Sequence, residues 1–230
     1  ARHFRFPIAM LDEILAIAGV EEVAPVRNAR VMVKGEPAMA IGLPIAHLQR
    51  RVPVHAVEGD PKEMLRRARA GEGVIVSENL ANIRGLHLGT IFEVDTPTGR
   101  HQFPVLGVVI GYSDQQGTFF IERELYVRYW RDDSVNVFRI FVKPGVQAAE
   151  VRKEILEKLG SHRRLFVLTN RELKDFVLNL TKQWFGMTYI QMAVALLVAI
   201  LGIVNTLTVS ITDRRRELGV LQAVGGMRNQ

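Results

Sequence analysis

Residues 187–211 read MTYIQMAVALLVAILGIVNTLTVSI, and this stretch decides the architecture of the chain. No charged residue occurs between Gln183 and Thr212. As an α-helix, these 25 residues extend roughly 38 Å, which exceeds the bilayer hydrocarbon core of about 30 Å. Buried helices of soluble proteins seldom contain more than about 14 uncharged residues in a row. The stretch therefore predicts a membrane-spanning helix.

The residues before this stretch continue the helix with an amphipathic pattern. Apolar residues recur there at spacings of three and four, while the charged residues fall on other faces. Asn170 is a suitable N-cap. We predict one long helix from Arg171 to about Ile211, in which residues 170–186 form a stalk and residues 187–211 span the membrane. The apolar stripe of the stalk consists of Leu173, Phe176, Val177, Leu180, Trp184 and Met187.

Gln191 and Asn205 are polar exceptions within the predicted span. Amide side chains inside a membrane usually hydrogen-bond to a neighbouring helix, with a contribution of about 0.6–2 kcal/mol each. Contact with a transported substrate is the alternative. Gly202 would allow a neighbouring helix to approach closely.

The composition of the 230 residues excludes several classes of protein. With 48% hydrophobic and 23% charged residues, the chain is neither disordered nor collagen-like. The absence of cysteine excludes a disulfide scaffold, a cysteine zinc site and a thiol nucleophile. The net charge of +6 is compatible with an acidic partner or an anionic membrane surface.

Residues 1–169 predict an α+β domain, because short apolar runs and short amphipathic segments alternate between turn residues. The turn at residues 96–99, Thr-Pro-Thr-Gly, indicates a hairpin. Helices are expected near residues 8–18, 62–70, 77–84, 122–130 and 148–159. Strands are expected as several short segments within 20–43, and at 74–76, 91–94, 103–110, 118–121, 135–142 and 165–168.

The ends of the chain suggest a fragment of a longer polytopic membrane protein. The sequence begins at Ala1 without an initiator methionine, and Asp12 and Glu13 interrupt its first apolar stretch, which is unlike a signal peptide. The charges that flank the span give only a weak orientation bias. An upstream membrane helix would place residues 1 to about 186 outside the cytoplasm.

The sequence contains no recognisable catalytic or metal-binding constellation. A P-loop, a His-Glu-x-x-His motif and a Gly-x-Ser-x-Gly motif are all absent. The six histidines are scattered, and Asp132-Asp133 is typical of a solvated turn rather than a metal site. Basic runs with interleaved aromatic residues, which favour nucleic-acid binding, are also lacking. We therefore expect no catalytic residues, no bound metal and no nucleic-acid partner.

Residues 212–226, TDRRRELGVLQAVGG, follow the span directly. The three arginines alone would suit anionic lipid headgroups, at roughly 1 kcal/mol per charge. Lipid attraction does not explain the apolar stripe of Leu218, Leu221 and Val224. A helix this short is marginal alone in water, so we expect it to pack against lipid or a partner protein.

Residues 205–228, NTLTVSITDRRRELGVLQAVGGMR, resemble the signature of the FtsX-type ABC permeases, a group that includes MacB, the LolC and LolE lipoprotein-release subunits and FtsX. In that family a membrane helix ends in an Asn-Thr-like turn, and an Arg-rich Glu-Ile/Leu-Gly-Ile/Val-Leu-x-Ala-x-Gly-Ala segment follows it. Looser similarity extends to VIVSENLANIRGLHLGT (74–90) and FPVLGVV (103–109), which resemble the family's extracytoplasmic core domain. Gly226 departs from the alanine that is commoner there.

This resemblance implies a permease subunit that performs no chemistry of its own. Residues 1–169 would form a MacB-type periplasmic core domain, and residues 212–230 a short cytoplasmic coupling helix. A separate cytosolic ABC ATPase would bind ATP and Mg²⁺, so this chain would hold no cofactor. ATP hydrolysis would move the stalk and the outer domain, which is called mechanotransmission. The residues implied in ATPase coupling are Arg214, Arg215, Arg216, Glu217, Leu218, Leu221 and Val224.

The resemblance also implies a location and partners. The full-length protein would be a multi-pass protein of the bacterial inner membrane. Its partners would be the ATPase, a second permease copy or a paralogue, and the lipid bilayer, with a periplasmic adaptor or a lipoprotein as a further candidate. The cargo stays open between export substrates and released lipoproteins or lipids, as does the case in which nothing is transported.

Two other classes of function remain as alternatives. The chain would then be either a membrane-anchored extracytoplasmic binding or regulatory domain, for example of a cell-wall hydrolase, or a membrane-tethered enzyme. A simple anchor has no need of the coupling segment. The lack of a convergent acid, base and nucleophile argues against the enzyme.

Overall fold

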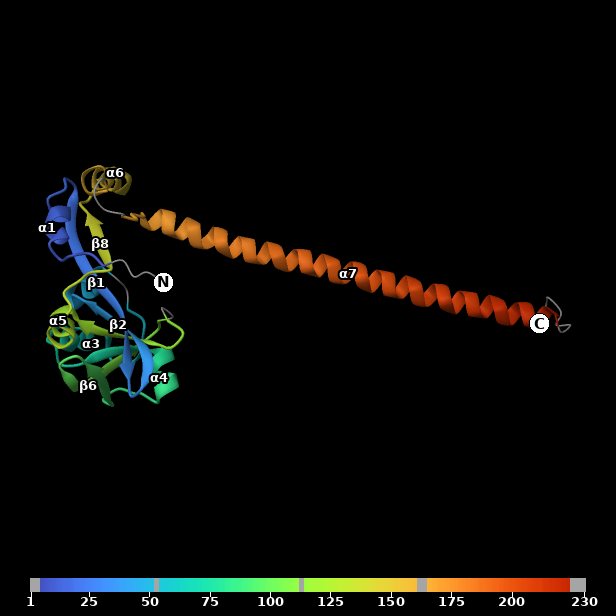
Figure 1. Cartoon of the computed structure of the whole chain (residues 1–230), viewed down its shortest axis with the longest axis horizontal. Helices are drawn as coiled ribbons and strands as arrows, with labels where there is room; N and C mark the ends of the chain where they lie inside the picture. Colours follow the sequence, from blue (N-terminus) through green and yellow to red (C-terminus); the bar gives the residue numbers. More distant parts are fainter. Residues whose placement is uncertain (1–4, 52–53, 112–113, 161–164, 224–230) are drawn as a thin grey trace. The chain divides into compact units, whose positions relative to one another are not determined.

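The computed structural model describes residues 5–51, 54–111, 114–160 and 165–223 (Figure 1). The chain divides into two compact units, Ala1–Leu165 and Phe166–Gln230. The first unit is a mixed α/β domain, and the second contains the long helix α7 (Asn170–Ala223). We describe each unit by itself.

The first unit is built on an eight-stranded sheet with the strand order β3-β6-β4-β7-β2-β1-β8, and β5 pairs with β6 beside this path. The pairs β4–β6 and β2–β7 are parallel, and the other pairs are antiparallel. The strands are β1 (Val20–Val33), β2 (Glu36–Leu43), β3 (Ala56–Glu58), β4 (Val74–Ser77), β5 (Ile91–Thr96), β6 (Gly99–Val109), β7 (Thr118–Glu122) and β8 (Val137–Val142).

Helices connect or cover these strands. Asp60 caps α3 by accepting a hydrogen bond from the Glu63 amide, and Ser77 caps α4 by accepting one from the Leu80 amide. Gly85 ends α4 in the left-handed conformation that favours glycine. The helices are α1 (Met10–Leu15), α2 (Ile45–Arg51), α3 (Pro61–Arg69), α4 (Glu78–Arg84), α5 (Arg123–Trp130) and α6 (Ala148–Leu159).

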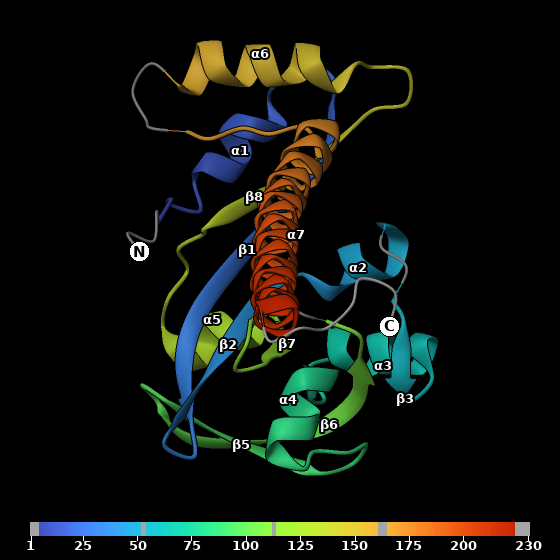
Figure 2. The same ribbon diagram turned by 90° about the vertical axis from the view of Figure 1, so that its right-hand side faces the viewer.

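Strand β1 changes partner along its length. Its residues 20–26 pair with β8, and its residues 27–33 pair with β2. This change divides the first unit into two lobes (Figure 2). We call α1, residues 20–26, β8 and α6 the small lobe. Residues 27–33 of β1 together with residues 36–130 form the large lobe.

Two hydrophobic clusters form the core of the large lobe. Strand β4 separates them, because Val74 and Val76 belong to one cluster and Ile75 to the other. The first cluster contains Phe119 and Tyr126, and the second is covered by α2 and α3. All four residues of β4 are buried, as expected for a central strand that is covered on both faces.

The structure agrees with most of the elements expected from the sequence and corrects two of them. The hairpin at residues 96–99 and the helices at α3, α5 and α6 are confirmed. Strand β1 is one continuous strand of 14 residues rather than several short ones. Residues 165–168 do not form a strand. The sequence analysis also missed α2 and β3, because both are short and lack a clear periodic pattern.

Gly42 is required for the packing of α5 on the sheet. A Cβ atom at this position would lie 2.7 Å from Cγ of Tyr126, a ring that is 1% exposed. We therefore expect Gly42→Ala to lower the free energy of unfolding by about 1–3 kcal/mol, measured by urea denaturation. Gly111→Ala is the matched control, because its Cβ would make an ordinary contact of 3.6 Å with Ser77. Equal stability of the two variants would contradict the prediction.

Candidate membrane-spanning and coupling helix

Helix α7 begins with a capping box at Thr169. The Thr169 hydroxyl accepts a hydrogen bond from the Glu172 amide, and the Glu172 carboxylate accepts bonds from the Thr169 amide and hydroxyl. The Thr169 carbonyl accepts from the Leu173 amide at 3.0 Å. The cap is therefore Thr169, one residue before the Asn170 predicted from the sequence.

From this cap, α7 runs without a break for 54 residues, or roughly 81 Å at 1.5 Å per residue. The predicted stalk (170–186), span (187–211) and cytoplasmic segment (212–230) are thus stretches of one helix as far as Ala223. No separate short helix follows the span within the described residues. The division into these three stretches remains a prediction.

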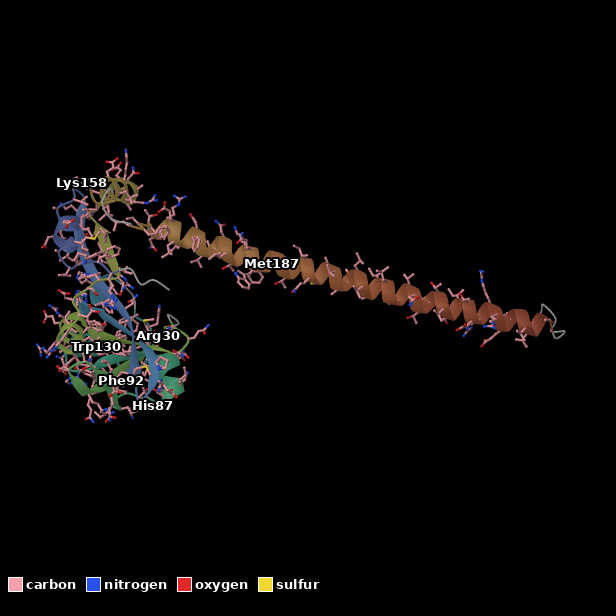
Figure 3. The ribbon with its side chains drawn as sticks, viewed as in Figure 1. Arg30, His87, Phe92, Trp130, Lys158 and Met187 are labelled. Atoms are coloured by element: carbon pink, nitrogen blue, oxygen red, sulfur yellow. The ribbon has the colours of Figure 1, made fainter. Side chains whose placement is uncertain are left out.

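Among the described residues, α7 is the one helix that is long and apolar enough to cross a membrane by length and composition. Its apolar window has a mean hydropathy of 2.4, and none of it is buried against the rest of the protein. Its side chains project on all sides around Met187 (Figure 3). A soluble protein cannot leave such a length of apolar surface in water, so the surface indicates lipid or other membrane helices as its surroundings.

Threonine hydroxyls within α7 satisfy their hydrogen bonds inside the helix. The hydroxyls of Thr188, Thr206 and Thr208 each donate to the carbonyl four residues earlier. These bonds remove the need for water, so the threonines are compatible with a hydrocarbon environment.

The helix brings Gln191 and Asn205 onto one face. They are 14 residues apart, and Gly202 lies eleven residues after Gln191 and three before Asn205. At 3.6 residues per turn these separations all return to nearly the same side. The two amides therefore share a face with a glycine, which suits close packing of another helix.

The candidate ATPase-coupling residues lie on different faces of α7. Glu217, Leu218 and Leu221 follow Arg214 by three, four and seven residues, so these four residues form one continuous stripe. Arg216 lies on the opposite side of the helix, and Arg215 lies beside the stripe. Both leucines are exposed. Val224 lies outside the described residues.

The first unit offers no metal site among the residues that the structure describes. No group of three or more His, Asp or Glu side chains is placed there to hold a metal ion. Asp132 is not a solvated turn residue, as the sequence suggested, because it is the partner of the buried Arg27. Arg66 and Arg67 on α3 pair with Glu63 and Glu72.

Comparison with known proteins supports the sequence resemblance. Residues 189–230 match the family model described as FtsX-like permease C-terminal. This segment of the chain is similar to the C-terminal part of the FtsX-like permeases. The matched segment includes the greater part of the span and every candidate coupling residue. The recognition made from residues 205–228 is thereby confirmed.

A curated protein similar to this chain is the uncharacterized ABC transporter permease protein Rv0987 of Mycobacterium tuberculosis. The two sequences are 25% identical over 174 residues, which is 75% of this chain. The alignment covers 20% of the relative, so this chain spans about a fifth of the length of that protein.

Two solved structures share the fold. The periplasmic region of MacB from Actinobacillus actinomycetemcomitans superposes with a TM-score of 0.54 at 14% identity, covering 77% of this chain and 86% of that one. The extracellular domain of the noncanonic ABC-type transporter YknZ from Gram-positive bacteria gives a TM-score of 0.51 at 12% identity, covering 68% and 83%. The mixed α/β domain of this chain thus resembles the fold of the MacB periplasmic region.

Proposed function

We propose that this chain is the transmitting part of an ABC transporter permease, in which α7 couples a cytosolic ATPase to an extracytoplasmic domain. The observation that carries the proposal is the continuity of α7. One unbroken helix contains a polar stalk end, an apolar middle and the FtsX-like segment that follows it. Movement at either end of such a helix reaches the other end.

The physical basis is the stiffness of an unbroken helix along its axis. Each residue of a helix adds one backbone hydrogen bond, and kinks arise mainly at proline or at interruptions of that ladder. Helix α7 contains no proline. An axial displacement at its cytoplasmic end would therefore arrive at the stalk rather than be absorbed by bending.

At the cytoplasmic end, we assign the ATPase contact to the stripe of Arg214, Glu217, Leu218 and Leu221. The two leucines would supply apolar area, while the charged pair would set orientation. ATP and Mg²⁺ would be bound by the partner ATPase. The stripe predicts a smaller role for Arg216, which lies on the opposite side of α7.

At the other end, residues 1 to about 186 would lie outside the cytoplasm, in a bacterial inner membrane. The fold supports this location, since the two similar structures are described as a periplasmic region and an extracellular domain. A second permease copy or a paralogue would pack against the face that contains Gln191, Gly202 and Asn205. The movement would serve export or the release of a lipoprotein or lipid.

The proposal is tested by purifying the full-length protein from native membranes in mild detergent. Mass spectrometry would identify the copurifying proteins, and an ATPase assay would measure their activity. We expect a P-loop ATPase to copurify. We further expect that Glu217→Lys and Leu221→Asp reduce the amount of ATPase recovered and abolish stimulation of ATP hydrolysis. The first variant reverses a charge in the stripe, and the second puts a charge in its apolar part.

Matched controls lie on the stalk of the same helix. Asp175→Lys makes the same kind of charge reversal as Glu217→Lys, and Leu178→Asp alters a leucine that is 56% exposed, against 62% for Leu221. Both controls should retain the ATPase. If no ATPase copurifies and the stripe variants behave like the controls, the proposal is wrong, and the chain is a membrane-anchored regulatory domain.

A further inference from the structure

The chain passes between the small lobe and the large lobe at two places within the described residues. The first crossing is inside β1, between Val26 and Arg27, where the strand changes partner. The second crossing is the segment of residues 131–136, which leads from the end of α5 to β8. A single extended crossing would leave the two lobes free to bend or twist about it.

Arg27 joins the first crossing to the second. This residue is 3% exposed, and its Nε and Nη2 atoms donate to Oδ2 of Asp132 at 2.9 and 2.7 Å. Its Nη1 atom donates to Oδ1 of Asn136 at 2.8 Å. The same oxygen also accepts from the backbone amide of Asn28 at 2.8 Å. Arg27 and its neighbour thus hold both ends of the second crossing.

The second crossing is also held internally and by α5. Oδ1 of Asp132 accepts hydrogen bonds from the amide and hydroxyl of Ser134 at 3.1 and 2.6 Å. Arg123 of α5 is 8% exposed, and its Nη2 atom donates to the carbonyl of Asp133 at 2.6 Å. These contacts leave residues 132–136 little freedom to move relative to the large lobe.

The opposite face of β1 is covered as well. Along a strand, Glu22 and Arg27 point to opposite faces, because side chains alternate. Nδ1 of His47 on α2 lies 2.7 Å from Oε1 of Glu22, and the imidazole stacks on Phe141 of β8 at a centroid distance of 6.3 Å. The large lobe therefore contacts the small lobe on both faces of the first crossing.

We propose that Arg27, Asp132 and Asn136 form a rigid joint, which ties the two crossings together and fixes the orientation of the two lobes. Charged hydrogen bonds are directional, and two of them converge on one carboxylate oxygen, so rotation at either crossing would break them. The small lobe contains β8 and α6, the last elements before α7 in the chain. If α7 moves as proposed above, the joint makes both lobes follow as one body.

The proposed joint concerns the stiffness of the connection between the two lobes. A change in the free energy of unfolding would not by itself establish it. A buried ion pair can be replaced by apolar side chains of similar volume with little loss of stability. The double variant Arg27→Met with Asp132→Leu therefore removes the directional bonds while it retains packing. The double variant therefore separates the directional role of the bonds from the packing role of the side chains. Arg27→Ala would remove both at once.

The experiment measures the distance between the two lobes in the full chain. The natural sequence has no cysteine, so Lys153→Cys on α6 and Ile83→Cys on α4 provide two unique and exposed positions for spin labels. Pulsed electron resonance then gives the distance distribution. We expect Arg27→Met, and the double variant with Asp132→Leu, to broaden this distribution. The amides of β8 should exchange with solvent about ten-fold faster or more.

Arg30→Met is the matched control on the same strand. The Arg30 side chain is 50% exposed and pairs with Asp114 inside the large lobe. Figure 3 labels Arg30 on the first unit. Arg30→Met should leave the distribution of distances between the two spin labels unchanged. If the folded double variant keeps the natural distribution, the joint is refuted. This measurement needs no nucleotide or ATPase, so its failure is distinguishable from failure of the proposed function, which the Glu217 and Leu221 variants decide.

Discussion

The combined substitution of Leu197→Arg and Leu201→Arg is expected to abolish insertion of α7 into a membrane. Both positions lie near the centre of the predicted span, four residues apart on one face of the helix. An arginine at the centre of a membrane helix costs about 2.5–3.5 kcal/mol, and the lost leucine adds about 0.5 kcal/mol. Two such changes cost roughly 6–8 kcal/mol, which exceeds what the remaining apolar residues can offset.

Extraction with alkaline carbonate of membranes that contain residues 1–230 alone measures this effect, because further membrane helices of a longer protein would retain the chain whatever α7 does. The natural helix should stay in the membrane pellet, and the doubly substituted helix should appear in the supernatant. Leu218→Arg with Leu221→Arg is the control, since the same change is made beyond the predicted span. The membrane assignment fails if both double variants stay in the pellet equally well.

The second large effect is expected at Asp132. Its replacement by alanine leaves the Arg27 guanidinium buried without its carboxylate partner, because the Arg27 side chain is only 4% exposed. Breaking a buried pair in this way costs about 3 kcal/mol or more. Asp95→Ala, which breaks an exposed pair with Arg100, should cost about 1 kcal/mol or less.

The cost at Asp132 is expected to depend on pH. Burial raises the pKa of Asp132, but hydrogen bonds from Ser134 and Arg27 outweigh this effect, so the pKa lies below its ordinary value of 3.8. Because the pKa of Asp132 is lower in the folded state than in the unfolded state, the ionised carboxylate stabilises the fold at pH values above the unfolded-state pKa. That contribution is lost as the pH falls through the folded value.

Urea denaturation of the full chain in detergent measures both effects. Fluorescence of Trp130 reports on the large lobe when Trp184→Phe removes the other tryptophan. The difference in the free energy of unfolding between the natural protein and Asp132→Ala should be largest at neutral pH and should shrink below pH 3.8. A difference that is independent of pH would show that the carboxylate charge is not what stabilises the cluster.

Local sequence patterns were sufficient to predict an element where the residues that begin or end it lie within the same short segment. The helix expected near residues 62–70 is α3, which Asp60 caps, and the turn at residues 96–99 predicted the β5–β6 hairpin. The cap of α7 was displaced by one residue, because Thr169 and Asn170 are both good caps and only the position of Glu172 selects between them. Helix α2 carried no such signal, since its first amide is capped from a distance by Glu122 of β7.

The role of Asp132 shows where sequence patterns failed. An acidic pair after an aromatic helix predicts a solvated turn, and nothing local connects it with a residue 105 positions earlier. One signal was available, since Arg27 directly follows the uncharged, largely apolar run VAPV (23–26). A charge buried next to such a run needs a buried partner, but the run does not say which carboxylate provides it.

The apolar length of residues 187–211 and the motif that follows were enough to predict a membrane-spanning helix and a resemblance to the FtsX-like permeases, because hydropathy and an arginine-rich segment act along one helix and need no distant partner. The change of strand partner in β1, the two lobes and the Arg27 cluster were not visible in the same way. They depend on contacts between residues about a hundred positions apart, and such contacts exist only once the sheet has brought β1, α5 and β8 together.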